Sequence, residues 1–139
     1  MANINELQRI STQVRRDIIR MVTNAKSGHP GGSMSSADFI TALYFEVMKH
    51  DPATWTRQGK GQDVFILSAG HLTPMYYSIL SRAGYFPTSE LSTFRLLGTR
   101  LQGHPCIETG LTGIVQASGS LGQGLSAAAG IALGKKLDK

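Results

Sequence analysis

Three of the four histidines in this sequence, His29, His71 and His104, directly follow a glycine, whereas His50 does not. An imidazole titrates near neutral pH and both donates and accepts hydrogen bonds. Three imidazoles around one polar substrate could therefore orient its hydroxyl groups and transfer protons. The same pairing fits histidines that bond the backbone of separate glycine turns, and the sequence favours neither interpretation. A metal site is a weaker explanation, because the histidines lie far apart in the chain and Cys106 is the only cysteine.

A second candidate site is the turn Ser118-Gly119-Ser120, which precedes an alanine-rich segment that runs to Lys136. Free backbone N–H groups at the start of a helix and the helix dipole both favour an anion, so the sequence predicts a phosphate at this turn.

The segment after this turn carries two stripes at four-residue spacing. One stripe is apolar (Leu121, Leu125, Ala129, Leu133 and Leu137), and the other consists of small residues (Gly122, Ser126, Gly130 and Gly134). Glycines inside a helix are unfavourable, so the small stripe predicts that a neighbouring backbone or a ligand approaches closely. A buried alanine and glycine helix packed in a core would explain the pattern equally well.

Hydrophobic periodicity predicts the elements that position these residues. A first helix begins at Asn3 or Asn5 and ends near Gly28 and Pro30, and the segment 27–33 is predicted to be a loop because it is rich in glycine. The remaining elements are a helix from Ser35 or Ser36 to Val47, a buried strand at 64–67, a helix at 73–82, a short helix from Thr88 or Ser89 to Leu97, and the final helix. The strand leads directly to His71, and ligands of α/β proteins bind where parallel strands end.

Length and composition limit the class of protein. The chain has 139 residues, enough for one domain with a core, and its 41% hydrophobic content is typical of a globular protein. The net charge of +5 is spread over helix faces without interleaved aromatic residues, so no nucleic-acid partner is expected. No apolar run has membrane-spanning length, so no membrane partner is expected either. A single cysteine fits a reducing compartment, and we expect a cytoplasmic protein.

Four motifs, taken in order, resemble the amino-terminal part of a transketolase. They are SGHPGG (27–32), LSAGH (67–71), LQGHP (101–105) and SGSLGQGLS (118–126), and together they cover about a hundred residues. The resemblance is greatest to split transketolases, whose two halves are separate chains. Ala69 stands where many members have asparagine. Ser120 stands where many full-length members have proline, and a Gly-Ser-Leu version is usual in the split type.

The resemblance implies an α/β fold of the thiamine-diphosphate-binding type, mostly helical with the start of a parallel sheet. It also implies transfer of a two-carbon ketol unit between sugar phosphates with thiamine diphosphate as cofactor. His71 would lie beside the diphosphate and the donor sugar, and His29 and His104 would face substrate hydroxyls. Gly119, Ser120 and Leu121 would contact the cofactor.

Further parts of such an enzyme are expected outside this sequence. Residues 1–139 would form the amino-terminal portion of one diphosphate-binding domain, ending before the Gly-Asp-Gly motif that holds Mg²⁺ or Ca²⁺ in the family. The partner would be a carboxyl-terminal transketolase half or subunit in a homo- or hetero-oligomer, and the isolated chain would be inactive. The alternatives are another thiamine-dependent carboligase, such as a dihydroxyacetone or deoxyxylulose phosphate synthase, and a non-catalytic binding subunit on the same scaffold.

Overall fold

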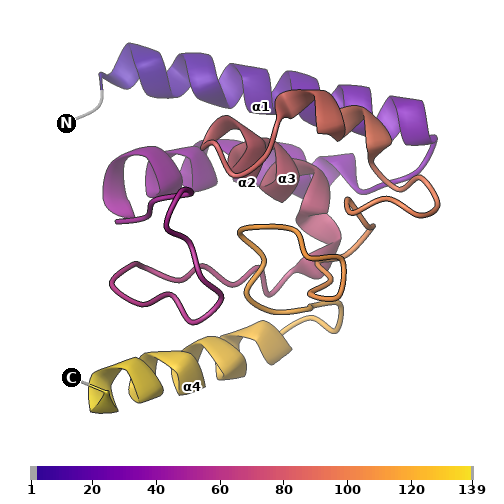
Figure 1. The fold of residues 1–139 in the computed structure, drawn as a ribbon. Coiled ribbons are helices and arrows are strands. Elements are labelled where there is room, and N and C mark those ends of the chain that lie inside the picture. The colour runs from indigo at the N-terminus through magenta and orange to yellow at the C-terminus, as the bar shows by residue number, and fades with distance from the viewer. Residues whose placement is uncertain (1–2, 139) are drawn as a thin grey trace.

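The computed structural model describes residues 3–138, in which helices are joined by long irregular segments (Figure 1). Helix α1 lies on one side of the molecule, α2 and α3 lie against it, and α4 lies on the opposite side (Figure 1). The elements in chain order are α1 (Ile4–Ala25), α2 (Pro30–Ala42), the π-helical turn η1 (Leu43–Val47), the 3₁₀ turn η2 (Gly70–Leu72), α3 (Thr73–Arg82), the 3₁₀ helix η3 (Thr88–Thr93) and α4 (Gln123–Leu137).

Helix α1 follows the sequence pattern closely. The Asn3 side chain caps its start by accepting a hydrogen bond of 3.0 Å from the Asn5 backbone N–H. Its apolar stripe places Val14, Ile18 and Met21 in the core. The left-handed residue that ends the helix is Lys26, with φ of 49°, rather than a glycine. No helix among residues 3–138 is long and apolar enough to cross a membrane.

The core lies between α1, α2 and α3, and α3 is its centre. Residues 73–81 of this helix are all buried. The Asp17 carboxylate of α1 accepts hydrogen bonds from Ser78 Oγ and from Arg82 Nε, both at 2.7 Å. A buried carboxylate is stable only when it is paired and hydrogen-bonded, so these contacts fix α1 on α3.

A second ion pair joins α1 to α2. The Arg15 guanidinium donates to both Asp38 carboxylate oxygens, at 2.7 and 2.8 Å, and Ser11 Oγ donates to the same carboxylate. These hydrogen bonds lower the pKa of Asp38 to about 2. The pair therefore stabilises the fold above pH ~4 and loses its effect as the pH falls through 2.

Helix α2 begins earlier than the sequence predicts. The segment 27–33 was expected to be a loop, but Pro30 is the first helical residue and Gly31, Gly32 and Ser33 form the first turn. Proline at this position has the φ that a helix requires and lacks the N–H that would be unpaired there. The prediction is therefore wrong for 30–33, and the start is shifted from Ser35 or Ser36 to Pro30. The short helix predicted from Thr88 to Leu97 ends sooner, as η3, at Thr93.

The strand predicted at 64–67 is not formed, and no strand occurs within residues 3–138. Val64, Phe65 and Ile66 are half-buried, and only Leu67 is buried. A strand requires a neighbouring strand to satisfy its backbone groups, and no described segment pairs with this one. Helix α4 covers it instead, since Ile66, Ala128 and Ile131 line a common crevice.

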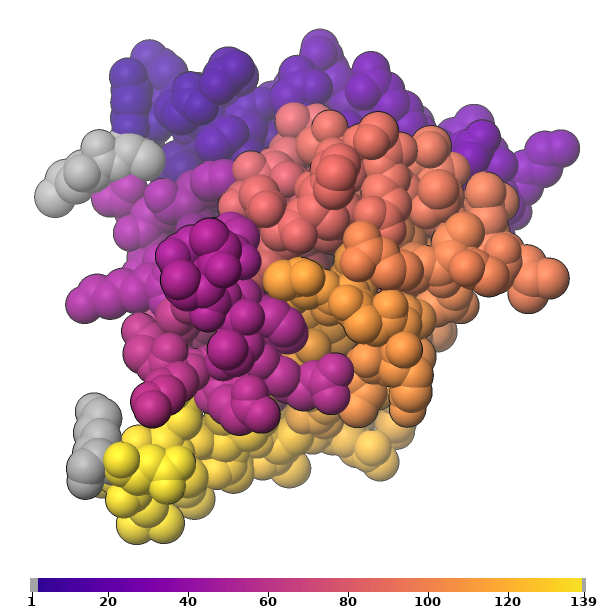
Figure 2. All heavy atoms as spheres, in the orientation of Figure 1, coloured from indigo at the N-terminus to yellow at the C-terminus, as the bar shows by residue number. Residues whose placement is uncertain are grey.

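Neither stripe predicted for α4 faces the rest of the chain. Leu125 and Leu133 are 73% and 63% exposed, and the space around Gly130 and Gly134 is open. The close approach occurs at Gly124, where an added Cβ would lie 2.6 Å from the Ser68 Cα. Figure 2 shows α4, in yellow, along the lower margin of the molecule.

Two glycine substitutions in α4 test this packing. Gly124→Ala forces a methyl group against the Ser68 backbone, and we expect the free energy of unfolding to fall by ~1–3 kcal/mol. Gly130→Ala is the matched control, because it meets no neighbour and gains up to ~1 kcal/mol of helix propensity. Urea unfolding followed by circular dichroism measures both. Equal effects of the two substitutions would contradict the contact at Gly124.

Candidate active site

The three Gly-His pairs converge although they lie far apart in the sequence. His29 precedes the first residue of α2, and His71 lies in η2 immediately before α3. Their ring centroids are 5.1 Å apart, with the rings inclined at 71°. The fold therefore brings these two imidazoles together, and the reason is that the amino-terminal ends of α2 and α3 lie side by side.

His104 completes the group from an irregular segment. Its ring lies near Gly119, where an added Cβ would be 3.7 Å from the His104 Cδ2. Partial desolvation lowers the pKa of His104, and the charges of Arg95, His29 and His71 lower it further. His29 and His104 are exposed and His71 is half-buried, so a solvent-borne ligand can reach all three rings.

Each glycine that precedes one of these histidines is in close contact with another element. A Cβ added to Gly28 would lie 2.9 Å from the Val22 side chain, and one added to Gly103 would lie 2.7 Å from Arg95 Nε. At Gly70 the added atom would meet the Ser118 carbonyl oxygen. Of these three glycines only Gly28 has a positive φ, of 140°. Glycine is therefore required before each histidine chiefly because a side chain would not fit there.

Helix α3 also fixes the segment that carries His104. Thr73 Oγ1 donates a hydrogen bond of 2.8 Å to the Gly103 carbonyl, and the Tyr77 hydroxyl donates one of 2.9 Å to the Gln102 carbonyl. Sequence reasoning missed both residues. On the sequence they read as ordinary members of a helix, and no local pattern shows that their hydroxyl groups point to a distant loop.

The Ser118-Gly119-Ser120 turn lies beside the histidines. A small surface pocket of about 220 Å³ is lined by Pro105, Gln116, Ala117, Ser118, Gly119, Ser120, Gln123 and Gly124. No carboxylate lines it, so its electrostatic character does not oppose an anion. Ser118 Oγ donates a hydrogen bond of 2.6 Å to the Leu67 carbonyl and so fixes the turn to the segment that leads to His71.

The helix after this turn begins later than predicted. The first residue of α4 is Gln123, and its N-cap is Gly122 with φ of 90°. Gly119 and Ser120 line the pocket, whereas Leu121 does not line it and is 68% exposed. The roles of Gly119, Ser120 and Leu121 toward a cofactor remain predictions. The described residues hold no group of three or more His, Cys, Asp or Glu side chains suited to a metal ion.

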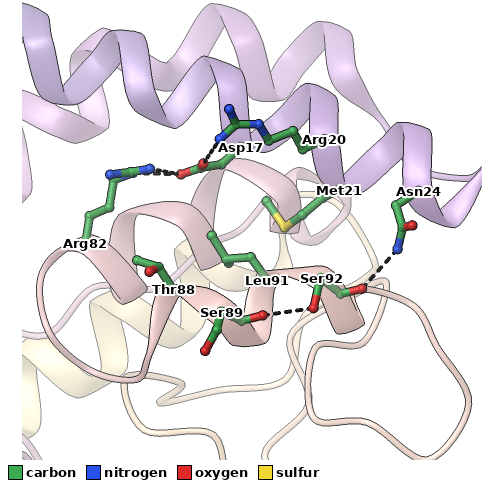
Figure 3. A pocket seen from close by; sticks show the side chains of 9 residues that line it. All are labelled: Asp17, Arg20, Met21, Asn24, Arg82, Thr88, Ser89, Leu91 and Ser92. Carbon is green, nitrogen blue, oxygen red and sulfur yellow. Dashed lines mark hydrogen bonds and ion pairs between the residues drawn. The ribbon is translucent and has the colours of Figure 1, made fainter.

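A larger pocket, of about 530 Å³, lies between α1 and η3 and contains none of the three histidines. Figure 3 shows that Asp17 lies between Arg20 and Arg82 at one end of it and that Asn24 lies at the other. Asn24 Nδ2 donates to the Ser92 carbonyl at 3.0 Å. Asp17, Arg82 and Asn24 in this pocket therefore fix α3 and η3 to α1.

The fold is that of the corresponding part of solved transketolases. Transketolase from Leishmania mexicana superposes on 90% of this chain with a TM-score of 0.79 and 33% identity. Transketolase from Campylobacter jejuni superposes on 89% of it with the same TM-score and 35% identity. The chain corresponds to 18% and 19% of those two structures.

Sequence comparison gives the family. The family described as "Transketolase, thiamine diphosphate binding domain" matches residues 7–138, and the chain belongs to this family. Mouse transketolase is 36% identical over 98% of the chain, which spans 21% of the mouse protein. A 6-deoxy-6-sulfo-D-fructose transketolase subunit of Clostridium sp. is 40% identical over 94% of the chain. An apulose-4-phosphate transketolase subunit of Phocaeicola vulgatus is 35% identical over 98%. The chain spans about half the length of these two relatives, 48% and 47% respectively.

The lowered pKa of His104 can be measured directly. We expect its imidazole to titrate below the ordinary value of 6.5 in the folded chain, because partial desolvation and three nearby basic groups disfavour the charged form. The folded state then binds fewer protons than the unfolded state, so stability falls as the pH drops below 6.5. Histidine-ring NMR, assigned with His104→Gln, gives the midpoint, and the urea-unfolded chain is the control. Equal midpoints in the two states would contradict the convergence of basic groups.

Proposed function

We propose that this chain provides the amino-terminal part of a transketolase, which transfers a two-carbon ketol unit between sugar phosphates. The observation that carries the proposal is the convergence of His29, His71 and His104 beside the Ser118-Gly119-Ser120 turn. A hydroxyl-rich substrate requires several adjacent donors and acceptors, and a diphosphate requires a turn free of carboxylates. The histidine cluster and the turn lie side by side, because Gly70 lies against Ser118 and Gly119 lies near the His104 ring.

The residues fit thiamine diphosphate. The pocket at the turn is lined by uncharged residues, among them Gln123, the first residue of α4, so backbone N–H groups at this helix start and the helix dipole both favour an anion. Gly119, Ser120 and Leu121 would hold the cofactor, and His71 would lie beside its diphosphate. When bound, the cofactor supplies the carbanion-stabilising chemistry that the side chains lack.

The histidines would act on the sugar. His29 and His104 are exposed and are positioned to hydrogen-bond substrate hydroxyl groups. The lowered pKa favours the neutral form of His104, whose free nitrogen can accept a proton from a hydroxyl group. His71 is half-buried, its ring contacts that of His29, and the preceding Gly70 contacts Ser118 of the turn, so it would orient the donor against the diphosphate.

Sugar phosphates are the substrate class we infer. The relatives are named for 6-deoxy-6-sulfo-D-fructose and apulose-4-phosphate, which are sugars with an anionic group. A polar site lined by three imidazoles suits the hydroxyl groups that such sugars share. The net charge of +5 favours the approach of anionic substrates.

The proposed enzyme includes a partner. Leu125, Leu133 and Leu137 on α4, and Leu121 just before it, are 63–84% exposed, and exposed apolar patches of this kind are typical of interaction surfaces. We infer that further transketolase sequence, and a carboxyl-terminal half or subunit in a homo- or hetero-oligomer, covers this face. Residues 64–67 would then join a parallel sheet, and Mg²⁺ or Ca²⁺ would be held by ligands outside this chain. A cytoplasmic location is proposed from the single cysteine.

The role of His104 is tested in an enzyme reconstituted with the remaining transketolase sequence. We expect His104→Ala to lower turnover of ketose donors by ~10²–10⁴-fold, because general acid–base groups contribute in this range, while cofactor affinity changes little. His50→Ala is the matched control: His50 bonds the Tyr44 carbonyl at 2.8 Å and Tyr85 at 3.1 Å, so its loss should affect stability and not turnover. Steady-state kinetics that are unchanged by His104→Ala would remove this residue from the site.

Cofactor binding is tested by titration calorimetry with thiamine diphosphate and Mg²⁺. We expect weak binding to the 139-residue chain, because neutral backbone donors offset only part of the charge of a diphosphate and a metal ion ordinarily offsets the rest. We expect tight, Mg²⁺-dependent binding when the remaining sequence is supplied. Micromolar, Mg²⁺-dependent binding to the 139-residue chain would show that the metal site lies within it. No binding by the reconstituted assembly would contradict the proposed function.

A further inference from the structure

Arg95 has a backbone conformation that is unusual for its residue type. Its φ is 59°, one of two positive values among the non-glycine residues described. Its backbone N–H donates a hydrogen bond of 2.8 Å to the Leu101 carbonyl, which closes the segment 95–101 on itself. A left-handed arginine is unfavourable in isolation, so the surrounding contacts must hold it.

The side chain of Arg95 bridges two of the histidine loops. Nη1 donates a hydrogen bond of 2.5 Å to Ser27 Oγ, two residues before His29. The Nε and Nη2 side of the guanidinium lies against Gly103, where an added Cβ would be 2.7 to 2.9 Å from Nε, Nη2 and Cζ. A side chain at position 103 would therefore displace the guanidinium from its place beside His104.

Phe94, the preceding residue, supports the same arrangement. Its buried ring lies under the Arg95 guanidinium, 5.7 Å from Cζ to the ring centre. The same ring lies 3.3 Å from the position of a Cβ on Gly28. Phe94 and Arg95 thus contact the glycines of two different Gly-His pairs. One of the arginine nitrogens, Nε, is buried and has no hydrogen-bond partner among the described residues.

We propose that Arg95 is a positioning residue that joins the loops carrying His29 and His104 and sets the distance between them. This inference rests on the proposed function for its purpose, since it concerns how the substrate-facing histidines are held. Its geometry does not depend on which sugar is bound. An arginine suits the role because its planar fork can hydrogen-bond through one nitrogen while its other nitrogens lie against a glycine.

The charge of Arg95 adds an electrostatic effect on the site. It lowers the pKa of His104, after the larger effect of desolvation and together with His29 and His71. Lysine would keep this charge without the planar fork, and glutamine would remove it. The two substitutions therefore separate positioning from electrostatics.

The test uses the full 139-residue chain without cofactor, and it compares Arg95→Gln, Arg95→Lys and the control Arg100→Gln. Arg100 is a suitable control because it bonds Glu90 at 2.9 and 2.7 Å, so its replacement also removes one charge. Histidine-ring NMR reports the His104 pKa, and amide hydrogen exchange reports the loops at 27–29 and 101–104.

In Arg95→Gln we expect the His104 pKa to rise and both loops to exchange ~10–100-fold faster, as expected for loss of a charged hydrogen bond. In Arg95→Lys we expect the pKa to stay near the parent value while exchange still accelerates. Unchanged pKa and exchange in Arg95→Gln, or the same changes in Arg100→Gln, would overturn the inference. If Arg95→Gln does not fold, Arg95→Gly replaces it, since glycine adopts the left-handed conformation without strain.

These readouts are independent of catalysis. Failure of the reconstituted enzyme to bind thiamine diphosphate would remove the proposed function and leave the role of Arg95 in the loops intact. Conversely, Arg95→Gln with unchanged loops and an active enzyme would remove only the positioning role.

Discussion

The site depends on close contact at three glycines that each precede a histidine. At Gly28, Gly70 and Gly103 the neighbouring atoms come so near that a Cβ would collide with them. Each loop is therefore held tightly against a neighbouring group (Val22, Ser118 or Arg95), while the residue after each glycine carries an imidazole into the shared space. Replacing any of these glycines would separate the histidines before it changed their chemistry.

The helices α1, α2 and α3 form the rigid base for these loops. The buried Asp17 carboxylate fixes α3 on α1, and α3 in turn holds the His104 segment through Thr73 and Tyr77. His29 and His71 are placed at the amino-terminal ends of α2 and α3, where a loop ends and a packed helix begins. Functional groups on such boundaries combine the reach of a loop with the rigidity of an element packed in the core.

Helix α4 contributes to the site only at its start. Gly124 is buried against Ser68, whereas the leucines further along are exposed. The apolar side of α4 is little packed, so the helix gains little from the hydrophobic effect. Most of its stability must come from its contacts with the segment 63–68 and from its own Lys135, which donates to the Gly59 and Gln62 carbonyls at 2.6 Å. The packed start of α4 thus lies next to the turn proposed to bind an anion, and its exposed leucines form the surface proposed to bind a partner.

The sequence by itself determined the features that depend on local spacing and residue type. The 3.6-residue period predicted α1 and α3. The Gly-His pairs pointed to the three histidines that the structure brings together, and the order of four motifs identified the family. Only the tertiary structure decided which glycine of α4 is in contact, that 64–67 lacks a strand partner among the described residues, and that Arg95 joins two loops. Pattern and propensity act between residues a few positions apart. Close approach and strand pairing depend on segments that folding alone brings together, such as Ser68 against Gly124 and Ser27 against Arg95.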